Sequence, residues 1–452
     1  MTMRGWSSAA LPVVVAATIV AACSSSDEAP APTLTGQALL DPNNCLPCHA
    51  DQFREWSGSM HAYAGEDPVF TAMNKRMQRE TNGQAGDFCV ACHAPVAVRL
   101  GLTKDGLNLA ELPAYARGVT CYFCHSTDAV EGTHNNPLHL ATDDTLRGGF
   151  DRPMKGTPHK ASYSTLHDRE QRDSARLCGA CHDVVTPEGA HIERTFTEWE
   201  GSLYSKPGQL PCGKCHMDGR SGFAANVDGA PQRRVHDHSM AAVDVALTPF
   251  TQMEAQRAAV QQLLDATLLG KLCVKQSPTG ILAEVTLDNA FAGHNFPSGA
   301  SQDRRAWVEI VAYREGAVVF SSGVAEEKKP ITALADPNLW LLRDKIFGKD
   351  GAEVHMFWQA ASVESNQLTA SVTTDPTDPA FYHSVTRTYP LPSPAPDRVT
   401  MRARMRPVDF DLLDDLVATG DLDAAILDKI PTFDLASTVK EWTRDGGFRC
   451  VE

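Results

Sequence analysis

Residues 45–49 read CLPCH, and the spacing Cys-x-x-Cys-His returns as CVACH (89–93), CYFCH (121–125), CGACH (178–182) and CGKCH (212–216). In such a pentapeptide two thiols form thioethers to the vinyl groups of one porphyrin, and the next imidazole binds its iron. A zinc ribbon or a redox dithiol does not require histidine after every second cysteine. The repeat therefore predicts five covalently attached haem c groups.

Each copy of the pentapeptide supplies two covalent anchors and one axial ligand. The predicted anchors are Cys45, Cys48, Cys89, Cys92, Cys121, Cys124, Cys178, Cys181, Cys212 and Cys215. The predicted first axial ligands are His49, His93, His125, His182 and His216. No catalytic residue is assigned from the sequence.

The opposite face of each iron needs a second ligand, and the sixteen histidines less the five of the motifs leave eleven. This supply suffices for five bis-histidine irons. The histidines predicted as second ligands are His61, His134, His167, His238 and His294. Two choices stay open, because His159 competes with His167 and His236 competes with His238. The alternative for each candidate is a surface or hydrogen-bonded histidine.

Two of these candidates carry a more specific argument. One helix continuing from Cys48 would separate His49 and His61 by about 18 Å, at about 1.5 Å per residue, so the two would serve different irons. His294 lies in AFAGHNFPSG (290–299), where glycine and proline indicate a tight loop at the end of a strand. Such a loop could present His294 to the haem region from a second domain.

The N-terminus has the features of an export signal. A basic start at Arg4 and an apolar run from Ala9 to Ala22 precede Cys23, and the run is too short to span a membrane. Val-Ala-Ala before Cys23 resembles a lipobox, which predicts a signal peptide over 1–22, acylation of Cys23 and a flexible tether over 23–40. We therefore expect an exported protein anchored by lipid to a bacterial membrane, the outer membrane being favoured, and facing the periplasm or the cell exterior. Ordinary signal cleavage beside an incidental cysteine is the alternative.

The remaining cysteines fit an oxidising compartment. Of thirteen cysteines, ten lie in the motifs and one is Cys23, which leaves Cys273 and Cys450. In an oxidising compartment these two are predicted to pair as a disulfide, and two free buried thiols are the alternative.

The apolar pattern divides the chain into two domains. Residues 41–248 have few long apolar runs, and about 40 residues per haem is too few to build an apolar core, so we predict a mainly α-helical and loop multihaem domain that folds only with haem. Residues 249–271 are predicted as a connecting helix. Beyond them, the segments 281–289, 305–313, 316–323 and 397–406 alternate apolar and polar residues. This predicts a β-sandwich-like, immunoglobulin-like domain over 272–452, with a helical segment at 409–430 on its edge.

The formal net charge of −15 excludes the basic footprint of a nucleic-acid-binding protein. The expected partners are redox proteins, and the membrane through the N-terminal lipid.

The residues around the motifs resemble a known family. Trp56, Ser59 and His61-Ala62 after the first motif, together with GVTCYFCH, LCGACH and GHNFPSG, resemble bacterial multihaem c-type cytochromes related to the nitrifier tetrahaem cytochrome. The resemblance spans most of 41–300. It implies electron transfer through closely packed bis-histidine haems. Relatives in the wider group reduce nitrite, hydroxylamine or tetrathionate at one haem with an open face.

Two functions follow as expectations. The first is an exported pentahaem cytochrome that carries electrons in a respiratory or extracellular electron-transfer chain, and we expect an electron-transfer protein rather than a catalyst. The alternative is a multihaem reductase or oxidase of a small nitrogen or sulfur oxyanion, with polar residues near His159, Arg169, His191 or Arg194 on the open side of one haem. None of the five motifs has lysine in place of its histidine, which weakens the nitrite-reductase version.

Overall fold

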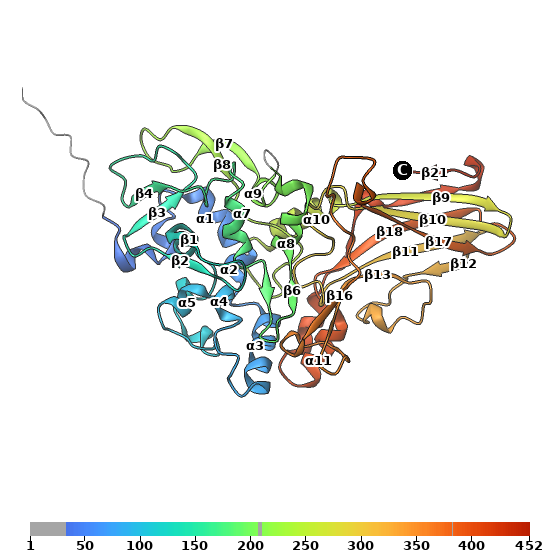
Figure 1. Cartoon of the computed structure of the whole chain (residues 1–452), viewed down its shortest axis with the longest axis horizontal. Helices are drawn as coiled ribbons and strands as arrows, with labels where there is room; N and C mark the ends of the chain where they lie inside the picture. The colour runs from blue at the N-terminus through green and yellow to red at the C-terminus, as the bar shows by residue number, and fades with distance from the viewer. Residues whose placement is uncertain (1–32, 207–209, 382) are drawn as a thin grey trace, which may run out of the picture.

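A computed structural model describes residues 33–206, 210–381 and 383–452 (Figure 1). The predicted signal peptide, Cys23 and most of the predicted tether lie outside these ranges. Short helices and small sheets make up the N-terminal part, and long antiparallel strands dominate the C-terminal part. Within the described ranges no helix is both long and apolar enough to cross a membrane.

The N-terminal part, which contains the five motifs, is built from short elements joined by loops. Its helices are α1 Ala50–Ser57, α2 Met60–Tyr63, α3 Pro68–Glu80, α4 Val90–His93, α5 Pro95–Arg99, α6 Cys121–Ser126, α7 Ser174–Gly179, α8 Thr195–Gly201 and α9 Gly213–His216. Its two-stranded sheets pair β1 Thr127–Val130 with β2 Leu138–Leu140, β3 Thr145–Gly148 with β4 Lys160–Tyr163, β5 Val184–Val185 with β6 His191–Glu193, and β7 Gly219–Phe223 with β8 Gln232–His236. The mixture of helix and loop is the predicted one, with added small sheets.

The first motif is not followed by one continuous helix. Helix α1 ends at Ser57, and the side chain of Ser59 accepts a hydrogen bond from the backbone N–H of Ala62, which caps α2. Helix α3 has a similar start, because Asp67 accepts from the N–H groups of Val69 and Phe70 and Pro68 occupies the first turn. His61 therefore lies on its own short helix rather than on an extension of α1.

A single helix, α10 Met253–Asp265, leads from the first part to the second. It is shorter than the predicted connecting helix over 249–271. Gln252 has a left-handed backbone with φ of 59°, so the helix begins only after it. Strand β9 already begins at Leu269, so the last three residues of the predicted helix are extended.

The C-terminal part consists mainly of two antiparallel sheets. The first has the order β17-β10-β9-β21, and the second has the order β12-β11-β18-β19 with β13 beside β11 and β20 beside β18. The bounds are β9 Leu269–Ser277, β10 Gly280–Asp288, β11 Arg305–Arg314, β12 Ala317–Ser322, β13 Trp340–Leu342, β17 Ser384–Leu391, β18 Arg398–Arg406, β19 Phe433–Asp434, β20 Lys440–Thr443 and β21 Cys450–Val451. A third sheet, β14 Asp344–Phe347 with β15 Glu353–Val354 and β16 Ser362–Ser365, lies toward the N-terminal part (Figure 1).

One large apolar core lies between the two main sheets. Val285 of β10, Ile310 of β11 and Met401 of β18 are almost fully buried in it. The alternation in β18 is the expected one up to Arg404. Arg406, which the pattern places with the outward arginines, is instead buried and donates to Asp409 at 2.6 Å. Because the ion pair compensates its charge, the guanidinium can lie inside the protein.

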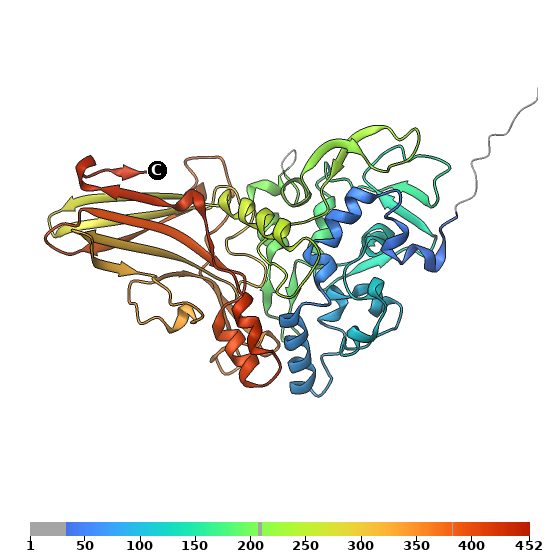
Figure 2. The ribbon, with the colours of Figure 1, turned by 180° about the vertical axis from the view of Figure 1, so that it is seen from behind.

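The helical segment predicted at the edge of the sheets contacts the other domain. It forms α11 Phe410–Ala418 and a 3-10 turn, Ala424–Lys429, separated by Gly420 at a φ of 72°. Helix α11 lies beside α3 when the molecule is seen from behind (Figure 2). Leu413 of α11 belongs to one apolar cluster with Met73 and Met77 of α3. The segment therefore joins the two parts rather than covering a sheet edge.

Cys273 and Cys450 face each other in the register of β9 and β21 and form a disulfide. The bridge attaches the last strand of the chain to the first strand of the C-terminal domain.

Candidate functional site

The motif cysteines of different pentapeptides lie close together. Neighbouring thiols join the first motif to the third, the second to the fourth, and the fourth to the fifth. The three pairs are Cys45 with Cys121, Cys92 with Cys181, and Cys178 with Cys212. These pairs form two sets, the first motif with the third and the second with the fourth and fifth, and an electrostatic contact between Cys124 and Cys178 joins the two sets. Groups anchored at these thiols would therefore lie close together.

Backbone carbonyls orient the motif histidines. The Nδ1–H of His49 donates to Ala224 at 2.7 Å, that of His125 to Arg147 at 2.5 Å, and that of His216 to Ala241 at 2.8 Å. His93 makes the same contact with Ala64 at 3.1 Å. A bond at Nδ1 fixes the ring and leaves Nε2 free to bind a metal.

Three motif histidines each face a second histidine ring. The ring centres of His49 and His159 are 6.1 Å apart, those of His182 and His61 6.1 Å, and those of His216 and His294 6.4 Å. Two nitrogen–metal bonds of about 2 Å each, plus the half-widths of two imidazoles, place ring centres about 6 Å apart on either side of one metal. The observed separations fit an iron between the rings of each pair.

His125 faces two rings, His238 at 6.5 Å and His167 at 5.6 Å. The Nε2 of His167 already contacts the carbonyl of Cys124 at 2.8 Å. In His238 the carbonyl of His236 holds Nδ1 at 2.9 Å, which leaves Nε2 free. The geometry therefore favours His238 as the partner of His125. The Nδ1–H of His236 donates to the carbonyl of Met217 at 2.9 Å, and the backbone carbonyl of His236 orients His238.

Two predicted second ligands lie elsewhere. His167 binds a motif carbonyl, while His159, its open alternative, faces His49. His134 faces His191 at 6.2 Å, and neither residue belongs to a motif. The loop that carries His134 is held by its neighbours, since Asn136 donates to Ala91 of the second motif. Sequence spacing could not separate these cases, because the partners are brought together only by the fold.

Within the described residues, His93 is the motif histidine without a second histidine opposite it. Throughout residues 33–206, 210–381 and 383–452, no other histidine ring centre lies within 6.5 Å of that of His93, which is the largest separation in the other four pairs. The ring in contact with His93 is that of Phe70, stacked at 4.1 Å and an angle of 6°. A parallel ring at that distance lies on the face of the imidazole and leaves the Nε2 direction free. The sequence contains enough histidines for five bis-histidine irons. Among the described residues, however, four motif histidines face a second histidine and His93 does not.

Comparisons with known proteins agree with the motifs and the architecture. Residues 44–126 match the family model described as cytochrome c554 and c-prime. A crystal structure of a penta-heme cytochrome c552 from Thermochromatium tepidum has the same fold, with a TM-score of 0.61, 19% sequence identity, and coverage of 91% of this chain and 100% of that chain. No curated protein matches the sequence. The five motifs, the family match over residues 44–126 and this fold support a multihaem c-type cytochrome.

Burial favours the neutral form of five of the paired imidazoles. It lowers the pKa of His61 to about 3 and the pKa of His182 and His294 to about 4. The pKa values of His125 and His238 also fall to about 4 because of burial. Neutral imidazole is the form that binds a metal, so these sites suit covalently bound haem c.

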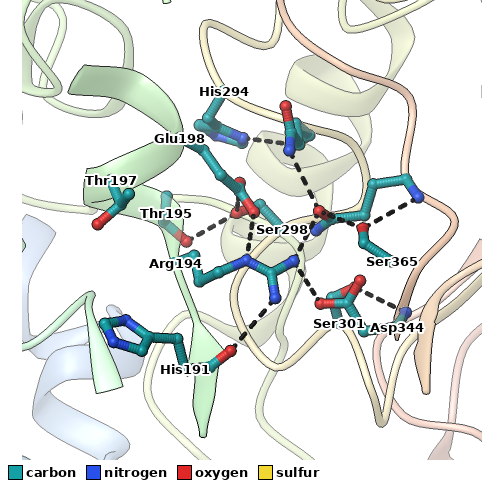
Figure 3. A network of polar contacts seen from close by, with 12 residues as sticks. His191, Arg194, Thr195, Thr197, Glu198, His294, Ser298, Ser301, Asp344 and Ser365 are labelled. Carbon is teal, nitrogen blue, oxygen red and sulfur yellow. Dashed lines mark hydrogen bonds and ion pairs between the residues drawn. The ribbon is translucent and has the colours of Figure 1, made fainter. Parts of the chain in front are cut away.

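The second domain reaches the motif region through the His294 loop. This loop contacts the first turn of α8, where Arg194 and Glu198 meet Ser298, Asp344 and their neighbours (Figure 3). Under the alternative reductase function, His191 and Arg194 are among the residues near which polar groups of an open haem are predicted. Arg194 instead lies in this polar network between the domains, and His191 pairs with His134.

Proposed function

We propose that the protein is an exported pentahaem cytochrome that carries electrons through four bis-histidine haems, with a fifth haem on His93 whose second axial position is open. The observation that carries the proposal is the set of ring pairs. Four motif histidines have a partner at 6.1–6.5 Å, and His93 has none among the described residues.

The arrangement of the motifs supports electron transfer as the main role. Haem supplies a one-electron redox centre, and its potential depends on axial ligands, burial and nearby hydrogen bonds. The chain's own residues provide all three, through paired neutral imidazoles held at Nδ1 by backbone carbonyls. The thiol contacts between Cys45 and Cys121, Cys92 and Cys181, and Cys178 and Cys212 place the anchoring points side by side.

The setting of this cytochrome in the cell follows from its N-terminus. We propose that the signal-like segment directs export and that Cys23 carries the lipid anchor, favouring the outer membrane. Redox proteins of the periplasm or cell exterior would be its partners. The two antiparallel sheets that enclose one core support the predicted sandwich-like architecture of the second domain, which supplies His294 to the haem on His216.

The number and spin state of the irons test this proposal. Intact-mass measurement of the purified holoprotein should give the mass of five haems above the processed polypeptide. Potentiometric titration followed by electron paramagnetic resonance should resolve four low-spin ferric haems and one high-spin haem. Fewer than five haems, or two or more high-spin haems in the native protein, would contradict it.

Reduction of a small ligand on the His93 haem is the second candidate function. The lack of a histidine ring opposite His93 among the described residues favours it, and so do the nearby carboxyl groups. Asp244 interacts electrostatically with His93 and with Asp67, whose pKa is raised by burial to about 6, so the Asp67 carboxyl group can take up a proton at mildly acidic pH. Turnover of nitrite, hydroxylamine or tetrathionate that carbon monoxide abolishes would establish this function. Electron delivery to a protein acceptor that carbon monoxide leaves unchanged would assign the chain to relay alone.

A further inference from the structure

The fifth motif depends on a residue from the other domain. His294 lies in the loop between β10 and β11, and its ring is 6.4 Å from that of His216 and inclined by 11°. The Nδ1–H of His294 donates at 2.8 Å to the carbonyl of Asn295, its own neighbour. That bond fixes the ring relative to the loop only. The position of the ring relative to His216 therefore depends on what holds the loop.

The first turn of α8, in the haem domain, holds this loop. Ser298 donates to Glu198 at 2.6 Å and lies 2.8 Å from the hydroxyl of Thr195. The same hydroxyl accepts from the backbone N–H of Gly299 at 3.0 Å. These bonds join the loop to the haem domain four to five residues after His294.

Arg194 links this first turn of α8 to Asn295, the residue next to His294, through Gln367. Its Nη2 donates to Asp344 at 2.8 Å and to the Oε1 of Gln367 at 3.1 Å (Figure 3). The same Oε1 accepts from the side chain of Asn295 at 3.2 Å. On its other side, Arg194 is 3.8 Å from Glu198. One guanidinium thus links α8, the third sheet and the His294 loop.

The network is buried, so the loss of its cation would be costly. The side chain of Arg194 is 19% exposed, that of Glu198 5% and that of Asp344 1%. Burial raises the pKa of both carboxyl groups, and Arg194 opposes that shift in each. Removing one partner of a buried pair leaves an uncompensated charge, which the structure relieves by moving apart or by taking up water.

We propose that Arg194 is the positioning residue for the His216 haem: its ion pairs with Glu198 and Asp344, and its bond to Gln367, hold His294 opposite His216. The inference rests on the proposed bis-histidine ligation of that haem. Without Arg194 the loop moves, His294 leaves its place, and the haem on His216 gains an open face.

The test compares holoprotein variants by electron paramagnetic resonance and by carbon monoxide titration of the reduced protein. Arg194→Gln should convert one further low-spin haem to high spin and raise the carbon monoxide bound from one to two per chain. His294→Ala should give the same spectrum, and added imidazole should restore the low-spin signal in both. Arg194→Lys keeps one charge and should give a smaller high-spin fraction.

The matched control is Arg404→Gln, which removes another arginine between two carboxylates. Arg404 pairs with Glu309 and Asp434 on a sheet face of the second domain and makes no contact with the His294 loop. This variant should bind one carbon monoxide, as the wild type does. If Arg194→Gln destabilises the whole protein, Gln367→Leu leaves both ion pairs of Arg194 in place. It removes the bonds of the Gln367 side chain to Arg194, Asn295 and the carbonyl of Pro297, and should still open the same haem in part.

The outcomes distinguish the ligation of the haem by His294 from the positioning role of Arg194. Wild-type spectra in His294→Ala would refute the ligation on which the inference rests. An open haem in His294→Ala, with wild-type spectra and carbon monoxide binding in both Arg194→Gln and Gln367→Leu, would refute the role of Arg194 alone.

Discussion

The two domains are stabilised in different ways. The C-terminal domain has one continuous apolar core between two sheets, to which Val243, Val245 and helix α10 also contribute. The N-terminal domain has short helices and small separate apolar clusters such as those around Phe123 and Val90. We infer from this difference that the first domain is organised around its haem groups. The second domain folds around an apolar core and contributes His294 as a ligand.

Loss of haem attachment should have the largest effect, because it should make one domain sensitive to protease and leave the other resistant. In protein produced without haem maturation, residues 33–248 should be digested rapidly by protease, because their core lacks the macrocycles. Residues 269–452 should remain protected by the sheets and the disulfide. Limited proteolysis with mass spectrometry measures both regions in one experiment. Protection of the N-terminal domain in the apoprotein would remove the distinction between the two.

Truncation in the sheet core should destabilise the second domain and spare the haem spectra. Ile310→Ala removes a fully buried side chain and should lower the free energy of unfolding of that domain by about 2–5 kcal/mol. Denaturant unfolding followed by tryptophan fluorescence gives the change. Val318→Ala, at an exposed position, is the control and should change it little. A shift of the haem absorption bands in Ile310→Ala would show that the core also supports the haems.

Removal of the disulfide should have a somewhat smaller effect on the same domain. The Cys273–Cys450 bridge closes a loop with a sequence separation of 177 residues. Replacing both cysteines by serine should cost about 2–4 kcal/mol of stability, since the unfolded chain gains freedom. Thermal unfolding should shift downward with unchanged haem content. An unchanged melting temperature would mean that the paired strands hold the terminus without the bond.

The ion pair between α3 and the α11 region should have the smallest effect and a defined pH range. The guanidinium of Arg79 lowers the pKa of Asp421 to about 2, from an ordinary value of 3.8. The carboxylate therefore stabilises the folded state above about pH 4, and this stabilisation is lost as the pH falls from about 4 toward 2. The difference in unfolding temperature between the wild type and Asp421→Asn should be present at pH 6 and shrink below pH 4. An equal difference at both pH values would contradict the assignment.

Sequence patterns predict local features such as the haem motifs and the strands. They do not predict which residues, distant in the sequence, the fold brings together. The motif spacing identifies the anchors and first ligands, and period-two alternation finds β10, β11, β12 and β18 to within about a residue at each end. The break between α1 and α2 has a local signal, a serine cap at Ser59, which the assumption of one helix passed over.

The pairing of histidines has no such local signal. His61 lies near the first motif in sequence and yet faces His182, while His159 rather than His167 reaches His49. Long-range packing decides these partners. The unpaired state of His93 is likewise a property of the assembled fold, because eleven spare histidines give no reason to expect it.

Carbon monoxide titration of the fully reduced wild-type holoprotein counts the haems that have an open axial position. Four haems closed by His159, His61, His238 and His294, and one left open on His93, predict binding of one carbon monoxide per chain. The absorption bands of the remaining haems should stay unchanged. Binding of none would mean that His93 acquires a second ligand in the holoprotein. Binding of two or more would mean that the ring pairs do not close the other haems.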